Sequence, residues 1–275
     1  MGDGQEQRPA SPADVYEAVF VPAIFEPLTR ATLDLARPQP GERVLDLACG
    51  TGIVARRAAP LVGDGGSVVG LDLRPGMIAK ARSLPAPEGA AIDWREGDAT
   101  ALPFAAGTFD LVLCQQGLQF FPDRTAAAAE MRRVLADGGR AVLAVWRGLE
   151  HLTLFRELTE AEARHLAKLG VSYEEIALPF LMGDEGEIRA ALAAGGFTAI
   201  TISEATITAS FPSADRFVRD VETAYASVMP QFVDDPSAFE AFVAAVAADL
   251  APALARYRDG DGVRFTLKAH MAVAQ

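Results

Sequence analysis

Two residue types that often carry chemistry are scarce in this 275-residue chain, which contains two cysteines and three histidines. Cys49 and Cys114 cannot supply a disulfide framework or a cysteine-based metal site, and we expect reduced thiols that serve as small residues. The chain has no Gly-x-Ser-x-Gly elbow and no paired histidine ligands. These absences argue against a nucleophile-elbow hydrolase and against a metal centre.

Positive charge is also in short supply, because 25 lysines and arginines face 37 acidic residues, for a net charge of -12 and a pI of about 4.8. Long-range electrostatics therefore oppose binding to nucleic acid or to an anionic membrane, and small molecules are the expected partners. We find no apolar run that we judge long enough to span a bilayer, and residues 1–14 are polar and proline-bearing, unlike a signal peptide. A cytoplasmic location is expected, whereas the oligomeric state stays open.

What the chain does have is a regular alternation of strand and helix signals through its first half, the pattern of a parallel sheet covered by helices. Hydrophobic residues make up 50% of the chain, enough for a large core. We expect strands at 44–47, 68–72, 91–95, 109–114 and 140–145, and helices at 52–59, after Pro75, and from Asp123 to about Leu135.

The ends of the chain depart from this alternation. Ser11 with Asp14 predicts a helix start, followed by two short helices that separate near Pro22 and stop at 37–40. In the second half we expect helices at 152–169 and 185–194 and strands at 200–207 and 263–273, with two amphipathic helices between those strands. The predicted organisation is an N-terminal helical cap at 1–40, a core at 41–212 and 258–275, and a helical lid at 213–257.

The segment Val44 to Gly52 joins a hydrophobic strand to a glycine-rich turn. Gly50-x-Gly52-x-x-Ala55 by itself fits the dinucleotide fingerprint. Asp46, however, would repel a diphosphate and attract an ammonium or sulfonium group. A nicotinamide dehydrogenase is further disfavoured because the chain has no Tyr-x-x-x-Lys pair.

Polar side chains recur at the predicted strand ends, namely Asp46, Asp72, Asp98 and Gln115. A parallel sheet binds ligands outside the carboxyl ends of its strands, so these groups should converge. Converging carboxylates fit a ligand with an ammonium, a sulfonium, ribose hydroxyls and an exocyclic amine. Simpler explanations remain for each residue: Asp72 could cap the next helix, Asp98 could hold a turn, and Asp46 could be solvated.

Five ordered motifs, at 44–52, 71–73, 96–99, 109–114 and 135–140, together resemble the class I S-adenosylmethionine-dependent methyltransferases of the small-molecule, bacterial type. The resemblance implies a Rossmann-like α/β fold with a doubly wound, seven-stranded, mostly parallel sheet, and S-adenosylmethionine as methyl donor with S-adenosylhomocysteine as product. It implies that Asp46 orients the donor's amino group, that Asp72 binds the ribose hydroxyls and that Asp98 meets the adenine amino group. The implied cofactor-binding residues are Asp46, Ala48, Gly50, Gly52, Asp72, Leu73, Met77, Asp98, Ala99, Gln115 and Tyr16.

Some of these assignments have a plain alternative. Met77 could be ordinary core, and Tyr16 with Phe20 could simply pack on the N-terminal helix instead of capping the cofactor. For the acceptor we expect contacts from Gln119, Phe120, Trp146 and Tyr225. Phe217, Met229 and Phe232 would add an apolar lining suited to a hydrophobic metabolite, although such helical stripes are often core. The segment after the fourth strand lacks the Asn/Asp-Pro-Pro-aromatic motif of enzymes that methylate nucleic acid bases.

The expected reaction is transfer of a methyl group from S-adenosylmethionine to a small, hydrophobic metabolite, with an O, C or N acceptor unresolved. A base is needed only if the acceptor must lose a proton, and no catalytic base can be assigned. His151 could reach the pocket, whereas His165 lies in a predicted helix and His270 in a predicted strand. The alternative is a protein of the same fold that binds the donor without methylating, such as a cyclase or a regulatory module.

Overall fold

A seven-stranded sheet forms the centre of the protein, seen in a computed structural model that describes residues 11–226 and 229–275. Its strands follow the order β3-β2-β1-β4-β5-β8-β6, and the two-residue β7 (Arg258–Asp259) pairs with β8 outside this path. Strands β3 to β5 are parallel, and β8 is antiparallel to both neighbours. The predicted doubly wound, mostly parallel fold is confirmed. The strands are β1 (Arg43–Leu47), β2 (Ser67–Asp72), β3 (Ile92–Glu96), β4 (Phe109–Gln115), β5 (Leu135–Trp146), β6 (Ile200–Phe211) and β8 (Gly262–Ala274).

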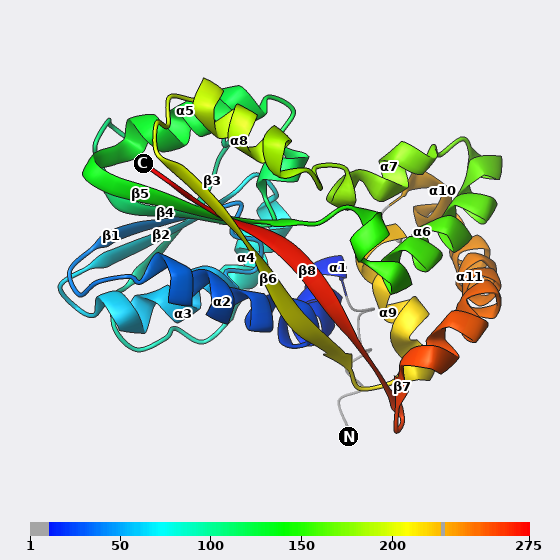
Figure 1. The fold of residues 1–275 in the computed structure, drawn as a ribbon. Coiled ribbons are helices and arrows are strands. Elements are labelled where there is room, and N and C mark those ends of the chain that lie inside the picture. Colours follow the sequence, from blue (N-terminus) through cyan, green and yellow to red (C-terminus); the bar gives the residue numbers. More distant parts are fainter. Residues whose placement is uncertain (1–10, 227–228) are drawn as a thin grey trace, which may run out of the picture.

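Helices cover both faces of this sheet (Figure 1). Helices α5 (Arg124–Val134) and α8 (Glu185–Ala194) lie on one face, and α2 (Glu26–Ala36) and α3 (Ile53–Val62) lie on the other. The central strands β1 and β4 are buried on both sides, so their sequences are nearly continuous apolar runs. Helix α4 (Pro75–Ser83) begins at the predicted proline, and Asp123 caps α5 by accepting a hydrogen bond from Ala126 N.

The N-terminal helices form one continuous run instead of two separate helices. Helix α1 (Pro12–Val15) starts at the predicted Ser11–Asp14 capping box, continues through a π-helical segment, η1 (Tyr16–Phe25), and joins α2. The predicted break near Pro22 is wrong. Pro22 lies inside the π-helical segment, whose i to i+5 hydrogen-bonding pattern differs from the α-helical pattern that proline normally interrupts. The run ends as predicted, with Arg37 in a left-handed conformation (φ 47°) before Pro38.

A helical lobe stands beside the sheet (Figure 1). It contains α9 (Ala214–Tyr225), α10 (Pro230–Val233) and α11 (Pro236–Tyr257), inserted between β6 and β8 as predicted. Helices α6 (Thr153–Leu166) and α7 (Tyr173–Ala177) lie with them and share their hydrophobic cluster, although the predicted division puts both in the core segment 41–212. Short 3-10 segments complete the chain: η2 (Leu118–Phe120), η3 (Leu149–His151), η4 (Ala167–Leu169) and η5 (Leu178–Phe180). The exact domain boundaries stay a prediction.

The ribbon of β6 and β8 sets the position of this lobe. The two strands pair over their full length, from Ile200 opposite Ala274 to Phe211 opposite Val263. Strand β5 ends at Trp146, opposite Ala269, so residues 263–268 extend beyond the carboxyl end of β5. That extension contributes Phe265 and other apolar side chains to the lobe cluster. The lobe is therefore held over the edge of the sheet where parallel strands end.

Helix α11 corrects one expectation drawn from the sequence. Within the described part of the chain it is the helix that is long and apolar enough to cross a membrane, with 22 residues and a mean hydropathy of 1.6 in its most apolar stretch. The expectation that no run reaches this length is therefore wrong. Only 28% of this stretch is buried inside the protein, and the buried part includes Phe242, Val246 and Leu250, which pack in the lobe cluster.

Candidate active site

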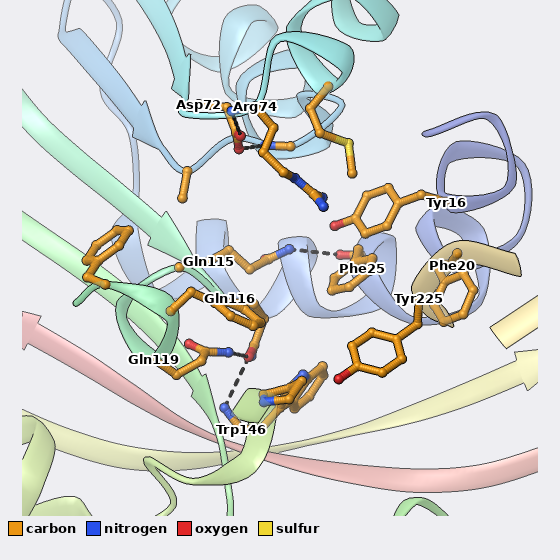
Figure 2. A pocket seen from close by; sticks show the side chains of 18 of the residues that line it. Tyr16, Phe20, Phe25, Asp72, Arg74, Gln115, Gln116, Gln119, Trp146 and Tyr225 are labelled. Carbon is orange, nitrogen blue, oxygen red and sulfur yellow. Dashed lines mark hydrogen bonds between the residues drawn. The ribbon is translucent and has the colours of Figure 1, made fainter. Parts of the chain in front are cut away.

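A cavity of about 530 Å³ lies between the carboxyl ends of the parallel strands, the N-terminal helix and the helical lobe (Figure 2). The residues predicted to bind cofactor or acceptor line this cavity, with the exception of Asp46, Gly52, Phe217, Met229 and Phe232. Those that line it are Tyr16, Ala48, Gly50, Asp72, Leu73, Met77, Asp98, Ala99, Gln115, Gln119, Phe120, Trp146 and Tyr225. One hollow thus joins side chains from distant parts of the sequence.

Asp46 and Gly52 lie beneath the glycine-rich turn instead of in the cavity wall. Asp46 is 1% exposed, and its Oδ2 accepts a hydrogen bond of 2.9 Å from Ala55 N at the start of α3. Burial raises the pKa of Asp46 to about 8, which favours the neutral form of this carboxyl group. Gly52 has φ +86° and precedes α3. Both residues shape the turn, and the direct cofactor contacts predicted for them stay predictions.

Asp72, at the end of β2, ties two loops together at the cavity wall. Its Oδ2 accepts from Gly50 N at 2.8 Å and its Oδ1 from Arg74 N at 2.9 Å. Each carboxylate oxygen can accept a second hydrogen bond. Asp72 lines the cavity, and its predicted contact with ribose hydroxyls stays a prediction. The alternative, that Asp72 orders the start of the next helix, is compatible with the same geometry.

Asp98 follows β3 and holds the turn after it. Its Oδ1 accepts from both the backbone N and the Oγ1 of Thr100, each at 2.8 Å. These bonds lower the pKa of Asp98, so the group is ionised at neutral pH. Asp98 and its neighbour Ala99 line the cavity, as does Met77, which is buried on α4. Asp98 therefore holds the turn at the cavity wall, and its predicted contact with the cofactor stays a prediction.

Tyr16 covers the glycine turn from the N-terminal helix. Its ring stacks on Phe25 at 4.9 Å between centroids and on Phe20 at 6.3 Å. A Cβ added to Gly50 would lie 3.6 Å from Tyr16 Oη, so the turn and the ring are in van der Waals range. Burial, and then the Asp72 carboxylate, raise the pKa of the Tyr16 phenol, which therefore stays neutral. Figure 2 shows this ring beside the cavity.

Gln115 has a structural connection that the sequence did not reveal. Its Nε2 donates to Phe25 O at 3.3 Å and to Thr29 Oγ1 at 3.1 Å, and its Oε1 accepts from Thr32 Oγ1 at 3.0 Å. The amide group is thus occupied by the N-terminal helical run. Gln115 lines the cavity, but it also fastens α2 to the end of β4.

The lobe contributes a set of cavity residues that was not predicted. They come mostly from α6, α9 and the segment around η5, and comprise Phe155, Leu158, Thr159, Glu162, Ile176, Pro179, Phe180, Val221 and Ala224. Phe217, Met229 and Phe232 were expected in this lining but pack with the lobe's hydrophobic cluster instead. The sequence does contain a signal for Glu162 that was missed. Leu154 and Leu158 form a buried apolar stripe on α6, and Glu162 places a carboxylate at the next position of that stripe.

Glu162 forms a buried carboxyl pair with Glu222 of α9. The two side chains belong to residues that are 4% and 0% exposed. Burial raises the pKa of Glu162 to about 7, and burial together with the Glu162 charge raises that of Glu222 well above its ordinary value. Two buried carboxylates that interact cannot both ionise readily, so the pair retains a proton. Glu162 lines the cavity and Glu222 lies behind it.

The three histidines have partners elsewhere. His151 lies against Arg147 and Glu150, His165 contacts Asp249, and His270 bonds Gly183 O at 2.9 Å. These histidines do not line the cavity. Within residues 11–226 and 229–275, no group of three or more His, Cys, Asp or Glu side chains is placed to hold a metal ion.

Known proteins share both the sequence motifs and the fold. A methyltransferase-domain family matches residues 44–139. The nocamycin O-methyltransferase of Saccharothrix syringae is 40% identical over 129 residues, 46% of each chain. The 2-phytyl-1,4-naphtoquinone methyltransferase of Synechococcus elongatus is 30% identical over 176 residues, 60% of this chain and 76% of that protein. The match spans about half the length of the first of these relatives.

Structural similarity extends over more of the chain than sequence similarity. The YcgJ protein of Bacillus subtilis superposes with a TM-score of 0.58 at 18% identity, covering 90% of this chain and 96% of that one. At this identity the comparison shows a shared fold. Together with the family match and the coverage of the Synechococcus elongatus relative, it establishes that the chain belongs to the class I S-adenosylmethionine-dependent methyltransferases.

Proposed function

We propose that this protein transfers the methyl group of S-adenosylmethionine to a small, hydrophobic acceptor. The observation that carries the proposal is the single cavity, which joins the strand-end residues Asp72 and Asp98 to an apolar chamber in the helical lobe. Its volume of about 530 Å³ lies within the usual range for small-molecule sites. Several relatives are methyltransferases for small molecules, which supports methyl transfer to a small acceptor in this protein.

The residues at the strand ends fit the methyl donor. Asp72 has spare acceptor capacity toward hydroxyl groups, Asp98 is ionised beside the cavity, and Gly50 brings the backbone to its wall. S-adenosylmethionine, when bound, supplies a methyl group activated by its sulfonium. We assign the donor to the core segments 41–212 and 258–275, and we assign Tyr16 to the N-terminal cap that covers it.

The lobe end of the cavity fits the acceptor. Phe155, Leu158, Ile176 and Phe180 supply apolar walls, and Trp146 lies at the boundary with the strand ends. This composition supports a hydrophobic acceptor body, with Tyr225 of the predicted lid 213–257 at its edge. The protein's main contributions would be to align the acceptor and to exclude water.

Glu162 is our candidate for the proton acceptor, where one is needed. It lines the lobe end of the cavity, and its pKa of about 7 suits a general base near neutral pH. An acceptor hydroxyl would give its proton to the Glu162 carboxylate while its oxygen bonds the methyl carbon. The carbon–sulfur bond would break with its electron pair left on sulfur, and the proton would later leave Glu162 for solvent.

A donor-binding protein that does not methylate is the alternative, because the fold and the donor-binding residues would be the same. The acceptor end of the cavity decides between the two functions. Incubation with methyl-labelled S-adenosylmethionine and a panel of phenolic, polyketide and amine acceptors should yield a labelled product and S-adenosylhomocysteine. Binding without turnover across a broad panel would favour the alternative.

Titration calorimetry tests the donor site separately. We expect S-adenosylhomocysteine to bind and NAD not to bind. Asp72→Asn should weaken S-adenosylhomocysteine by about tenfold or more, because it removes a charged acceptor from the wall. Asp93→Asn, which removes an exposed carboxylate on β3, is the matched control and should leave the affinity unchanged. Tight NAD binding, or an Asp72→Asn variant with normal affinity, would contradict the proposal.

A further inference from the structure

Gln116 and Gln119 form a buried pair of amides in the wall of the cavity (Figure 2). Gln116 follows β4 directly, and Gln119 lies in the short segment η2. Gln119 Nε2 donates to Gln116 Oε1 at 2.7 Å, and the residues are 1% and 9% exposed, respectively. Within the described residues, Gln116 Nε2 and Gln119 Oε1 are buried and have no hydrogen-bond partner.

The orientation of both amides follows from a backbone group. Trp146 N, at the end of β5, donates to Gln116 Oε1 at 3.2 Å. A backbone N–H can only donate, so the atom that it faces must be the carbonyl oxygen of Gln116. Gln119 must then present its NH₂ group to the same oxygen. These two hydrogen bonds fix which end of each amide is oxygen and which is nitrogen. The unpaired atom of Gln116 is therefore a donor, and that of Gln119 is an acceptor.

Leaving these two atoms unpaired is costly. An unsatisfied buried polar group has given up its hydrogen bonds to water and has gained none in the protein. The backbone adds to this cost, since Gln116 is a non-glycine residue with φ +58°. Two bonds to β5 hold it there: its N donates to Ala144 O at 2.8 Å, and its side chain accepts from Trp146 N. A ligand that occupies both free atoms would recover the cost of the unpaired groups.

We propose that Gln116 Nε2 and Gln119 Oε1 bind one neutral hydroxyl group of the methyl acceptor, as in a phenol or an enol, and that this hydroxyl is distinct from the group that gives its proton to Glu162. This inference rests on the proposed function and specifies its acceptor. A hydroxyl oxygen accepts from Gln116 and its hydrogen donates to Gln119, so both free atoms are satisfied at once. A carboxylate would face the Gln119 oxygen without a hydrogen, and an ammonium would face the Gln116 NH₂ without a lone pair. The pair therefore selects against both charged groups.

Four probes with one apolar body test this selection by titration calorimetry. 2-Naphthol can donate and accept, 2-methoxynaphthalene can only accept, 2-naphthoate is anionic and 2-naphthylmethylamine is cationic. Each is titrated with and without S-adenosylhomocysteine. We expect 2-naphthol to bind about tenfold more tightly than 2-methoxynaphthalene, and the two charged probes to bind more weakly than 2-naphthol.

The variant Gln119→Met isolates the proposed bond, because it keeps the length of the side chain and removes the acceptor oxygen. In this variant 2-naphthol should lose its advantage over 2-methoxynaphthalene, whereas S-adenosylhomocysteine should bind as in the parent protein. Gln39→Met, at an exposed position, is the control and should retain the advantage. The melting temperature of each variant shows whether it is folded.

The possible failures are distinguishable. If S-adenosylhomocysteine does not bind the parent protein, the proposed function is contradicted, while the probe comparison still tests the amide pair. If it binds, but 2-naphthol has less than a twofold advantage or does not bind, the assignment of the amide pair is wrong. If Gln119→Met weakens S-adenosylhomocysteine as much as 2-naphthol, the pair belongs to the donor site.

Discussion

Ala48 and Gln116 follow the neighbouring strands β1 and β4 and share a left-handed backbone conformation, with φ +57° and +58°. Non-glycine residues pay roughly 1–2 kcal/mol for this conformation. Both line the cavity, and a methyl group on the nearby Gly117 would lie 2.7 Å from Ala48 Cβ. The strained residues thus gather where the chain must turn sharply at the strand ends, leaving room for a ligand.

Substitutions at Ala48 should expose this strain. Ala48→Gly relieves the left-handed cost but adds chain entropy to the unfolded state, so we expect unfolding free energy to rise by no more than about 1 kcal/mol. Ala48→Val places a branched side chain in the same conformation and should lower it by roughly 1–3 kcal/mol. Urea unfolding monitored by circular dichroism measures both. A valine variant as stable as the parent would show that the left-handed conformation is not kept in solution.

Gln115 should act mainly as a fastener for the N-terminal helical run. Gln115→Leu removes its three hydrogen bonds to Phe25, Thr29 and Thr32, and we expect the unfolding free energy to fall by about 1–3 kcal/mol. Amide hydrogen exchange should speed up first in residues 12–36. A double-mutant cycle with Thr29→Val should give a coupling of at least about 0.5 kcal/mol. Additive effects would mean that the bond to Thr29 contributes nothing.

Local patterns were sufficient to predict most of the sheet. Strands β1, β2 and β4 were located to within about a residue. Each is a short, continuous apolar run bounded by glycine, proline or aspartate, a pattern typical of a buried strand. The same strand-end logic brought Asp72 and Asp98 to one cavity. Periodicity reports which side of an element is buried, and parallel topology then dictates which ends meet.

Other features depend on partners distant in sequence and could not be read locally. Pro22 suggested a break, yet the helix continues through it in a π-helical pattern. Helix α6 showed an ordinary amphipathic pattern, and nothing in it revealed that its partners were α9 and α11. The predicted contact of Asp46 with the cofactor stays a prediction, and the sequence did not reveal that its carboxyl group bonds Ala55 N beneath the turn. Contacts between elements that are distant in sequence determine these features.

Trp94 provides a further example with a direct test. Its ring lies over both Gly52 and Gly70, so that a Cβ at either position would overlap it. We expect Gly70→Ala to lower the unfolding free energy by on the order of 1–3 kcal/mol through this overlap. Combining Gly70→Ala with Trp94→Leu should recover part of the loss, because the smaller side chain vacates the space. If Trp94→Leu gives no recovery, the cost arises from the strand backbone instead of the ring.

The carboxyl pair Glu162–Glu222 should make stability depend on pH. An unfolded glutamate loses its proton near 4.5, whereas folded Glu162 retains it to about 7. Between these values the folded state binds more protons than the unfolded state, so the unfolding free energy falls as pH rises. The contribution of Glu162 levels off above about 7, and Glu222, whose pKa is also raised, adds a fall in the same direction. The buried Asp46, with a pKa of about 8, adds a fall in the same direction.

Glu222→Gln should remove much of this dependence. The neutral amide needs no proton and can donate to the Glu162 carboxylate, so we expect about 1 kcal/mol or more of added stability at pH 8 and little change at pH 4.5. Chemical denaturation at both pH values measures the difference. Glu174→Gln, at an exposed position on α7, is the control and should change neither value. A stabilisation equal at both pH values would contradict the buried-pair explanation.

Glu162→Gln tests the proposed proton acceptor in the reaction itself. With a phenolic acceptor from the labelled-methyl screen, kcat of the parent protein should rise with pH up to about 7 and then level off, since the ionised Glu162 is the active form. In the Glu162→Gln variant, kcat should be roughly 10²–10⁴-fold lower than in the parent protein and should no longer rise with pH. The affinity for S-adenosylhomocysteine should stay unchanged. Glu160→Gln, exposed on the same helix, controls for the loss of charge. An unchanged pH profile in Glu162→Gln would assign the proton to solvent, and a loss of S-adenosylhomocysteine affinity would place Glu162 with the donor.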